Sequence, residues 1–374
     1  MRVGVPKEIK TAEARVGITP PGVEAFVNNG HEVYIEKEAG LGSGITDEEY
    51  IKAGAKIVNT SKEIYETADL ILKVKEPQPN EYDYLREGQV LFAYLHLAPD
   101  KQQTQALLDR KVIGIAYETV QLDNGSLPLL TPMSEIAGRM AVTIGAYLLT
   151  NMNKGRGIVL GGVPGVEPAE VVIIGGGTVG INAARTAIGM GARVTVIDID
   201  PRRLAYLDDI FNGRATTLMS NNYNIAQSAQ RADLLIGAVL IPGARTPKLV
   251  TKDIVKTMKN GSVIVDVAID QGGCVETCNI TTSHNNPYFI RYGVVHYSVP
   301  NIPGAVPRTS TFALTNVTLP YALQIANKGY KNALLENQAL LKGLNVYKGM
   351  LTYKPVAEAQ GLHYIDPIQA LNNA

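Results

Sequence analysis

The sequence predicts an α/β protein built from two Rossmann-like, doubly wound parallel-sheet domains with an active-site cleft between them. Three observations predict this class. Strand-like and helix-like segments alternate along most of the chain, its 374 residues exceed the length of one typical domain, and an apolar strand near the middle runs directly into a glycine-rich turn. Such alternation implies mainly parallel sheets with helices on both faces.

The first unit begins at the N-terminus and repeats short apolar strands and amphipathic helices. Strands are expected at residues 3–5, 31–36, 56–58, 70–74, 89–95 and 112–117, and helices at residues 22–29, 47–53, 61–67 and 100–110. Ser61 is expected to be the N-cap of the helix that starts there. The order of these elements predicts one mainly parallel sheet.

The second unit starts near Pro132 with a long helix, residues 134–150, and a glycine-rich loop, residues 155–165. Its strands are expected at residues 171–174, 193–197, 215–219, 234–239, 262–267 and 294–297. Six strands match the usual Rossmann count. The rest of the chain, residues 309–371, reads as largely helical, and we expect it to pack on the first unit.

The strand at residues 171–174 leads into the pattern G-x-G-x-x-G, formed by Gly175, Gly177 and Gly180. The first glycine allows a tight turn, the second a close approach of backbone to a pyrophosphate, and the third close packing of helix on strand. Asp198 ends the next strand, where an acid can accept from both ribose hydroxyls and repel a 2′-phosphate. The pattern predicts an NAD site; the alternative is an ordinary glycine-rich turn with a surface aspartate.

Composition excludes several classes of protein. The formal net charge is zero, with 35 basic and 35 acidic residues, which argues against nucleic acid or an anionic membrane as the main partner. The first residues do not read as a signal peptide, so none is expected, and no uncharged apolar run reaches the ~18 residues of a membrane span. Cys274 and Cys278 have no second cysteine pair, so free thiols in a reducing cytoplasm are expected rather than a metal site.

Polar side chains follow several of the predicted strands. In open α/β sheets, ligands bind outside the carboxyl ends of the strands. In the first unit, these positions and the loop after the first strand hold Arg15, Lys75, His96 and Glu118. In the second unit, they hold Asp198, Ser220, Leu240, Asp270 and Asn301. Two polar sheet edges that face each other would form the cleft.

These residue types suggest a chemistry. Arg15 and Lys75 suit an anionic substrate, since arginine can hold a carboxylate by two hydrogen bonds and lysine acts as a point charge. His96 can accept and donate protons near neutral pH. Asp270 could orient a water molecule or a histidine. The alternatives are solvated surface cations, a structural histidine and a turn aspartate before glycines.

Several motifs resemble those of alanine dehydrogenase and of the related soluble subunit of nicotinamide nucleotide transhydrogenase. They lie at residues 2–8 (RVGVPKE), 13–16 (EARV), 73–77 (KVKEP) and 296–310 (HYSVPNIPGAVPRTS). The last is the most specific, and the resemblance covers the whole chain.

The resemblance implies an NAD-dependent oxidoreductase that reversibly deaminates L-alanine to pyruvate and ammonia, assembled as a cytoplasmic homohexamer. It also implies that residues 133–305 form the NAD-binding Rossmann domain, inserted between the two parts of a substrate and catalytic domain, residues 1–132 plus 306–374. Arg15 and Lys75 would then anchor the substrate, and His96 and Asp270 would transfer protons.

The resemblance further implies a set of NAD contacts on the second domain. Together with the glycine turn, they are Ser134, Gly175, Gly177, Thr178, Val179, Gly180, Asp198, Arg203, Ser220, Val239, Leu240, Val267, Ala268, Ile269, Asp270, Ser298, Val299, Pro300 and Asn301. Some relatives carry a histidine for a divalent cation in the C-terminal helix; residues 323–327 contain none here, so no metal is expected.

Three other functions remain open. The chain could be the NAD(H)-binding subunit of transhydrogenase, a reductase that aminates a larger 2-oxo acid in the manner of saccharopine dehydrogenase, or a non-catalytic NADH-sensing module. The presence of Lys75, His96 and Asp270 together favours the dehydrogenase, because a sensing module needs neither an acid/base pair nor a cationic clamp.

Overall fold

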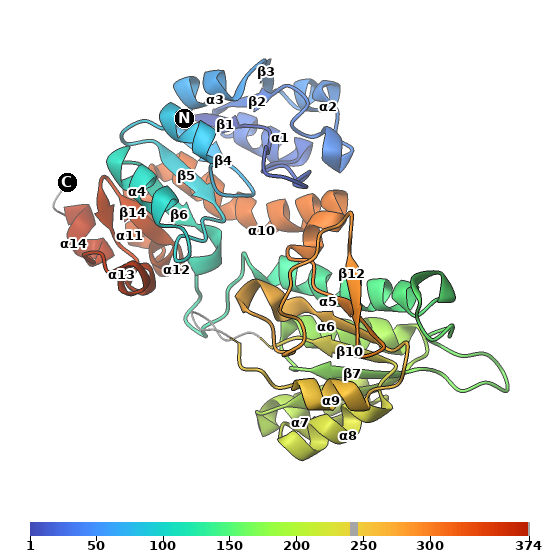
Figure 1. Ribbon diagram of the computed structural model, residues 1–374. Helices are drawn as coiled ribbons and strands as arrows, with labels where there is room; N and C mark the ends of the chain where they lie inside the picture. The colour runs from blue at the N-terminus through green and yellow to red at the C-terminus, as the bar shows by residue number, and fades with distance from the viewer. Residues whose placement is uncertain (240–245, 373–374) are drawn as a thin grey trace. The chain divides into compact units, whose positions relative to one another are not determined.

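The computed structural model describes residues 1–239 and 246–372, so the predicted cofactor contact Leu240 lies outside the described residues. The chain divides into two compact units: unit 1 comprises Met1–Pro132 and Val306–Ala374, and unit 2 comprises Met133–Ala305 (Figure 1). Both units are parallel-dominated α/β structures, which confirms the predicted α/β class with two parallel-sheet domains.

Within the described residues, unit 1 contains an eight-stranded sheet of order β15-β14-β6-β5-β4-β1-β2-β3. The strands are β1 (Arg2–Val5), β2 (Glu32–Glu36), β3 (Lys56–Val58), β4 (Leu70–Leu72), β5 (Val90–Ala93), β6 (Ile113–Ala116), β14 (Leu344–Tyr347) and β15 (Met350–Leu351). Strands β1 to β6 are parallel, and β14 and β15 add an antiparallel edge. The strand order reverses between β1 and β4, which makes that position a topological switch point.

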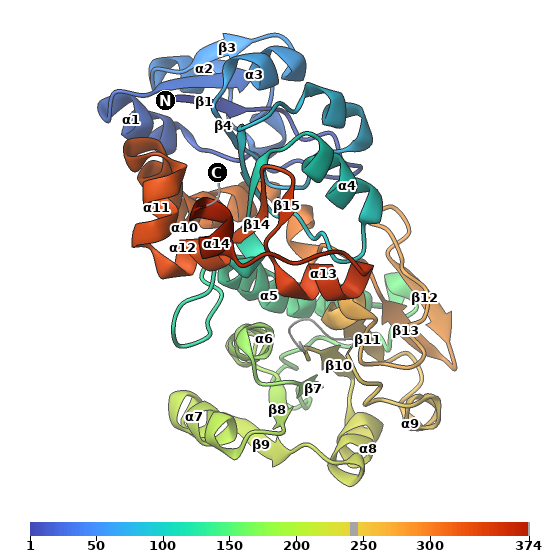
Figure 2. The same cartoon turned by 90° about the vertical axis from the view of Figure 1, so that its left-hand side faces the viewer.

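The helices of unit 1 come from both ends of the chain (Figures 1 and 2). They are α1 (Pro20–Asn28), α2 (Asp47–Lys52), α3 (Ser61–Thr67), α4 (Lys101–Asp109), α10 (Pro307–Lys328), α11 (Tyr330–Glu336), α12 (Gln338–Lys342), α13 (Lys354–Gln360) and α14 (Pro367–Asn372), with short 3₁₀ turns η1 (Leu41–Ser43), η2 (Pro79–Tyr84) and η3 (Tyr117–Thr119). Every residue of β4, β5 and β6 is buried, as expected for central parallel strands covered on both faces.

Unit 2 contains, within the described residues, a seven-stranded sheet of order β12-β13-β11-β10-β7-β8-β9. The strands are β7 (Glu170–Ile174), β8 (Arg193–Asp198), β9 (Ala215–Met219), β10 (Leu234–Gly237), β11 (Val263–Asp266), β12 (Tyr288–Arg291) and β13 (Val294–Tyr297). Without the antiparallel β12, the order of strands is that of the dinucleotide-binding fold, with its switch point between β7 and β10.

Both faces of the unit 2 sheet are buried. Val171 and Ile173 of β7 belong to one hydrophobic cluster, while Val172 and Ile174 belong to another, because successive residues of a strand point to opposite faces. The helices of this unit are α5 (Thr131–Leu148), α6 (Thr178–Gly189), α7 (Pro201–Phe211), α8 (Asn222–Arg231) and α9 (Lys252–Thr257), with 3₁₀ turns η4 (Asn151–Asn153), η5 (Val267–Gln271) and η6 (Ile302–Ala305). No helix in the described part of the chain is long and apolar enough to cross a membrane.

The structure differs from the sequence predictions at three places. The N-cap of α3 is Thr60, whose side chain accepts from the N–H of Glu63, and not Ser61, which is the first helical residue. The antiparallel strand β12 lies in a stretch for which no element was expected. The C-terminal segment is largely helical but includes the hairpin β14–β15, whose turn places Lys348 and Gly349 at positive φ of 46° and 87°.

A buried ion cluster stabilises the centre of unit 1. The ammonium of Lys73, which is 0% exposed, lies 3.2 Å from the carboxylate of Glu8 and 3.1 Å from that of Glu81. The hydroxyl of Tyr65 donates to Glu81 at 3.0 Å. Burial lowers the pKa of Lys73, but the two glutamates more than offset this and raise it above its usual value. Lys73 therefore stays charged and separates two buried carboxylates.

Replacing Lys73 by methionine should lower the free energy of unfolding by about 3–5 kcal/mol, because it leaves two carboxylates buried without their cation. Urea unfolding monitored by circular dichroism would measure this loss. Lys62→Met provides the control, since Lys62 and Glu66 form an exposed pair at 3.7 Å whose loss should hardly matter. An unfolding midpoint of Lys73→Met equal to that of the unmodified protein would contradict this account of the cluster.

Candidate functional site

Four of the predicted site residues of unit 1 lie at one edge of its sheet. Arg15 follows β1, Lys75 follows β4, His96 follows β5 and Glu118 lies in η3 directly after β6. These four strands are parallel neighbours in the order β6-β5-β4-β1, so their carboxyl ends share an edge. Arg15 and Lys75 follow the two strands that flank the switch point, where ligands bind in open α/β sheets.

Arg15 is fixed in place by a second charged residue. Its guanidinium is only 2% exposed and donates to both carboxylate oxygens of Glu13, at 2.7 Å from Nε and 2.5 Å from Nη2. Burial lowers the pKa of Arg15, but Glu13 outweighs burial and the net shift is upward. The bidentate pair therefore holds a charged, oriented guanidinium, which reduces the entropy lost when a ligand binds.

Lys75 lies beside this pair and is half-buried. Burial and the positive charge of Arg15 lower the pKa of its ammonium, while Glu13 and Glu76 act in the opposite direction. The ammonium has no hydrogen bond or ion pair among the residues that the structure describes. Two neighbouring cations, one of which has no bound anion, are what a carboxylate ligand requires.

His96 holds an unusual backbone conformation at the end of β5. Its φ angle is +47°, in the left-handed region, which costs a residue with a Cβ about 1–2 kcal/mol. The imidazole is exposed and stacks on the ring of Tyr94, with ring centroids 5.7 Å apart and an interplanar angle of 7°. Its Nδ1 lies 3.8 Å from Oε1 of Glu118. The strained backbone thus presents an accessible imidazole next to a carboxylate.

Tyr94 links the cations and the imidazole. Its buried hydroxyl donates to the carbonyl of Leu129 at 2.6 Å, and burial raises the pKa of this hydroxyl while Arg15 acts to lower it. The electrostatic interaction with Arg15 and the stacking on His96 show that these residues lie in one cluster. Tyr94 was missed in the sequence, although it precedes His96 by two positions and alternate residues of a strand share a face.

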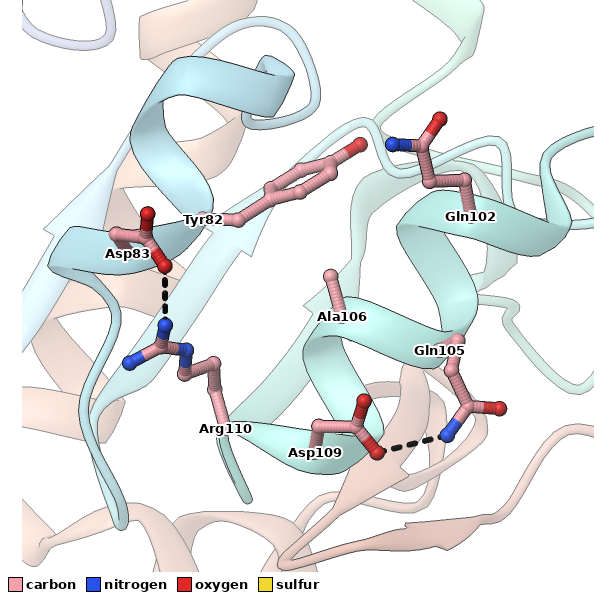
Figure 3. A pocket seen from close by; sticks show the side chains of 7 residues that line it. All are labelled: Tyr82, Asp83, Gln102, Gln105, Ala106, Asp109 and Arg110. Atoms are coloured by element: carbon pink, nitrogen blue, oxygen red, sulfur yellow. Dashed lines mark hydrogen bonds and ion pairs between the residues drawn. The ribbon is translucent and has the colours of Figure 1, made fainter.

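Two cavities lined by described residues of unit 1 can be compared with the predicted site. A small one of about 120 Å³ is lined by Lys7, Glu8, Glu13, Ala14, Arg15, Glu38, Ala39 and Gly42. A larger, open one of about 750 Å³ is lined by Tyr82, Asp83, Gln102, Gln105, Ala106, Asp109 and Arg110. In the larger cavity, Arg110 pairs with Asp83 and Gln105 with Asp109 (Figure 3). Only the small cavity includes a predicted site residue, Arg15, so the larger one is not part of the candidate site.

The glycine turn of unit 2 has the geometry that its three glycines allow. Gly175 has a φ of +103°, and a Cβ there would lie 2.5 Å from the carbonyl oxygen of Ala238. A Cβ on Gly180 would lie 1.8 Å from the carbonyl oxygen of Gly175, so any side chain would force α6 away from β7. A Cβ on Gly177 would meet nothing within 4 Å, which leaves open space in front of the N-terminus of α6.

That helix N-terminus can receive an anion. Gly177 is the N-cap of α6 and provides no side chain to satisfy the first N–H groups of the helix. Those groups and the positive end of the helix dipole suit a pyrophosphate. Thr178 and Val179, which were predicted to contact the cofactor, are the first two residues of this helix.

Asp198 lies at the same turn. Its Oδ2 accepts from the N–H of Gly176 at 2.6 Å, and its Oδ1 accepts from the N–H of Asp200 at 2.9 Å. Nε of Arg203 donates to the carbonyl of Gly176. One bond to each oxygen leaves lone pairs for the hydroxyls of a ribose. The residues of this turn therefore fit the adenosine half of a dinucleotide.

The other predicted cofactor contacts are spread along the carboxyl edge of the same sheet. Ser220 follows β9, Val239 follows β10, residues 267–270 form most of η5 after β11, and residues 298–301 follow β13. The N–H of Ser220 donates to the carbonyl of Asp198 at 2.8 Å. Ser134 is the exception, because it lies on α5.

Asp270 lies in η5 and is exposed. Its Oδ2 accepts from the N–H of Asn301 at 3.4 Å, which ties the segment after β11 to the segment after β13. The fully buried Asp266 stabilises the segment after β11 by accepting from the N–H groups of Ala268 at 3.2 Å and Val275 at 3.0 Å. His96 and Asp270 belong to different units, so their joint action stays a prediction.

Comparison with known proteins shows what the chain resembles. The family model "Alanine dehydrogenase/PNT, N-terminal domain" matches residues 4–137, and "Alanine dehydrogenase/PNT, C-terminal domain" matches residues 141–354. Alanine dehydrogenase of Methanococcus maripaludis is 65% identical over 372 residues and that of Staphylococcus haemolyticus 57% over 371 residues, each over at least 99% of both chains.

Solved structures agree with these matches. A structure of L-alanine dehydrogenase superposes with a TM-score of 0.94 at 52% identity, covering 96% of this chain and 99% of the other. A transhydrogenase structure from Sinorhizobium meliloti has a TM-score of 0.80 at 24% identity, covering 94% and 99% of the two chains, a likeness that shows the fold alone. From both domain models and full-length relatives of 57–65% identity, the chain belongs to the alanine dehydrogenase/PNT family.

Proposed function

We propose that this protein is an NAD-dependent L-alanine dehydrogenase, which converts L-alanine, water and NAD⁺ to pyruvate, ammonia, NADH and a proton in a reversible reaction. The observation that carries the proposal is the placement of Arg15, Lys75 and His96 at adjacent strand ends around the switch point of unit 1, in a chain of this family. The named alanine dehydrogenases at 57–65% identity support the choice of substrate.

NAD would be held by unit 2 and would supply the acceptor for the hydride that leaves C2 of alanine. The N-terminus of α6 would bind the pyrophosphate, and Asp198 the adenosine ribose. The carboxylate of Asp198 would repel the 2′-phosphate of NADP. Further contacts would come from Ser134, Arg203, Ser220, Val239, Leu240, Val267, Ala268, Ile269, Asp270, Ser298, Val299, Pro300 and Asn301.

Arg15 and Lys75 would anchor the substrate by its carboxylate. Glu13 keeps the guanidinium charged and oriented before the substrate arrives, so little reorganisation is needed. The ammonium of Lys75 lacks a bound anion within the described residues, and a substrate carboxylate would provide one and reverse the unfavourable effect of Arg15 on its charged form.

His96 would transfer protons during the hydration step. Loss of the C2 hydride leaves an iminium, which water attacks, and a base must take the proton of that water. The exposed imidazole next to Glu118 suits this role, because the nearby carboxylate stabilises the imidazolium that forms. Asp270 would orient the attacking water or the leaving ammonia.

The transhydrogenase subunit is a weaker candidate, since its support is a likeness of fold at 24% identity. We also propose that the enzyme works in the cytoplasm as a homohexamer. The two free, buried cysteines Cys274 and Cys278 support a reducing compartment. The hexamer rests on the family resemblance, and light scattering of the purified protein would test it.

The purified protein should form NADH from L-alanine and NAD, and it should use NADP far less well. Absorbance of the reduced cofactor measures the preference for NAD over NADP. The same assay with glycine or L-glutamate in place of L-alanine measures the preference for the amino acid. Asp198→Gly should narrow the preference for NAD, because it removes the carboxylate that repels a 2′-phosphate. A protein that forms no NADH from L-alanine, or that uses both cofactors equally, would contradict the proposal.

Lys75→Ala should lower kcat/KM for L-alanine by roughly tenfold to a hundredfold or more while NADH binds as before. A charge-assisted contact in a desolvated site is worth about 1.5–3 kcal/mol. Steady-state kinetics and NADH fluorescence titration measure the two effects. Lys62→Ala, in an exposed pair on α3, is the matched control. Near-normal turnover by Lys75→Ala would exclude the anchoring role.

His96→Ala and Asp270→Asn should each nearly abolish deamination, and the double variant should lose little more than the worse single variant, because residues that act as a unit are not additive. His96→Ala should also alter the pH profile of the unmodified enzyme. Kinetics of the singles and the double across pH provide the measurement. An active His96→Ala enzyme with an unchanged profile would refute the assignment.

A further inference from the structure

Two glutamates bind the backbone at the ends of two adjacent strands, next to two residues of the candidate site. Oε1 of Glu8 accepts from the N–H groups of Val74 at 2.6 Å and Lys75 at 3.1 Å, after β4. Oε1 of Glu118 accepts from the N–H groups of Leu95 at 3.2 Å and His96 at 2.6 Å, after β5. In each case one carboxylate oxygen accepts from two successive backbone N–H groups. The second of these belongs to a residue of the candidate site, Lys75 or His96.

These N–H groups need acceptors because they lie beyond the paired part of each strand. The pairing of β4 with β5 ends at Leu72 and Phe92. Two more backbone bonds follow it: the N–H of Lys73 donates to the carbonyl of Phe92 at 3.3 Å, and the N–H of Tyr94 donates to that of Val74 at 3.2 Å. Two successive N–H groups that point to one side form a small anion-binding concavity, which a carboxylate fills. Each glutamate therefore determines the direction in which its segment leaves the sheet.

For His96 the direction matters most. Its positive φ is a conformation that a residue with a Cβ leaves when nothing holds it. The carbonyls of this segment are held as well: Gln103 donates to Leu95 at 2.9 Å, and Gln360 donates to Leu97 at 2.6 Å. Glu118 supplies the missing half, the acceptors for the N–H groups, and its Oε1 also lies 3.8 Å from the imidazole.

Glu8 is itself fixed. Its other oxygen, Oε2, lies 3.2 Å from the buried ammonium of Lys73, which Glu81 holds from another side. Glu8 also lines the small cavity with Glu13 and Arg15. The position of the Lys75 backbone is therefore set by the buried cluster of Glu8, Lys73 and Glu81.

We propose that Glu8 and Glu118 are a matched pair of positioning residues, Glu8 holding Lys75 for the substrate carboxylate and Glu118 holding His96 for proton transfer. The kinetic part of this inference rests on the proposed function. A purely structural role would make both glutamates stabilise the fold in the same way. A positioning role predicts different kinetic effects for the loss of each glutamate, because Lys75 and His96 have different tasks.

Glutamine variants test the pair, since glutamine keeps the shape and one acceptor oxygen while the charge is lost. Glu8→Gln should raise KM for L-alanine and for pyruvate by roughly tenfold, with a smaller change in kcat, the effect of about one charge-assisted hydrogen bond. Glu118→Gln should lower kcat by roughly tenfold or more, with a smaller change in KM. Both should bind NADH with unchanged affinity, because the residues proposed to bind it lie in unit 2.

Glu49→Gln is the matched control. Glu49 also accepts a backbone N–H, that of Thr46 at 2.7 Å, but it does so in the capping box of α2. It should alter neither KM nor kcat. Thermal melting of all three variants gives the loss of stability that each bond contributes. If KM and kcat of Glu8→Gln and Glu118→Gln change by the same factors, or do not change, the inference is overturned.

A second measurement needs no enzymatic activity. Diethyl pyrocarbonate acylates neutral, accessible imidazoles, and peptide mapping by mass spectrometry gives the rate for each histidine. His96 should react faster in Glu118→Gln than in the unmodified protein, while the exposed His363 keeps its rate and Glu8→Gln leaves both unchanged. This result without NADH formation from alanine would refute the proposed function and support the positioning role of Glu118. An unchanged rate at His96 would overturn that role.

Discussion

Parallel sheets impose one constraint that determines most of this structure: all their strands end at one edge, where the backbone N–H groups lose their partners. In both units, carboxylates near that edge provide the acceptors. Glu8 and Glu118 do so in unit 1, and Asp198 and Asp266 do so in unit 2. The same edge is where ligands bind, so the groups that complete the fold also surround the candidate sites.

This constraint has an energetic consequence in unit 1. Burial raises the pKa of Glu8, which means that the folded protein disfavours its charge, although Lys73 and the N–H of Val74 oppose that shift. The fully buried Lys73 is shared with Glu81, and a charge in this position is tolerated only because each partner is hydrogen-bonded. The cluster is thus costly to bury and strongly destabilising to break, and it fixes the carboxylate that accepts from the backbone N–H of Lys75.

The sequence was sufficient for the fold because the hydrophobic pattern and glycine positions are local signals. Buried strands such as β10 and β11 consist almost entirely of apolar residues, and the glycine turn after β7 follows a pattern with a physical cause. The elements that were missed are weaker or depend on context. The strand β12 (YFIR) sits alone in a polar stretch, and the hairpin β14–β15 was hidden in a helix-rich segment although its Lys348-Gly349 turn was a usable signal.

The strand-end rule also placed Arg15, Lys75, His96 and Glu118 at one sheet edge, as the structure has them. It could not assign partners. Glu8 contacts Lys75 across 67 positions, and no local pattern distinguishes it from an ordinary surface glutamate near the N-terminus. The left-handed conformation of His96 likewise depends on contacts with Glu118 and on a segment held by Gln360, from the far end of the chain. Long-range hydrogen bonds of this kind produce no periodic pattern in the sequence.

The charges around the edge of unit 1 favour one kind of substrate. Arg15 is balanced by Glu13, and Lys73 lies between Glu8 and Glu81, whereas the ammonium of Lys75 has no ion pair among the described residues. Near His96 the balance is reversed, since Glu118 places a carboxylate beside a neutral imidazole or an imidazolium. One end of the site therefore attracts an anionic group and the other a cationic group or a proton. A small zwitterion would satisfy both ends, with its carboxylate at the Arg15–Lys75 end and its ammonium toward Glu118 and His96. This distribution of charge agrees with an amino acid as the reduced substrate rather than with a simple 2-hydroxy acid.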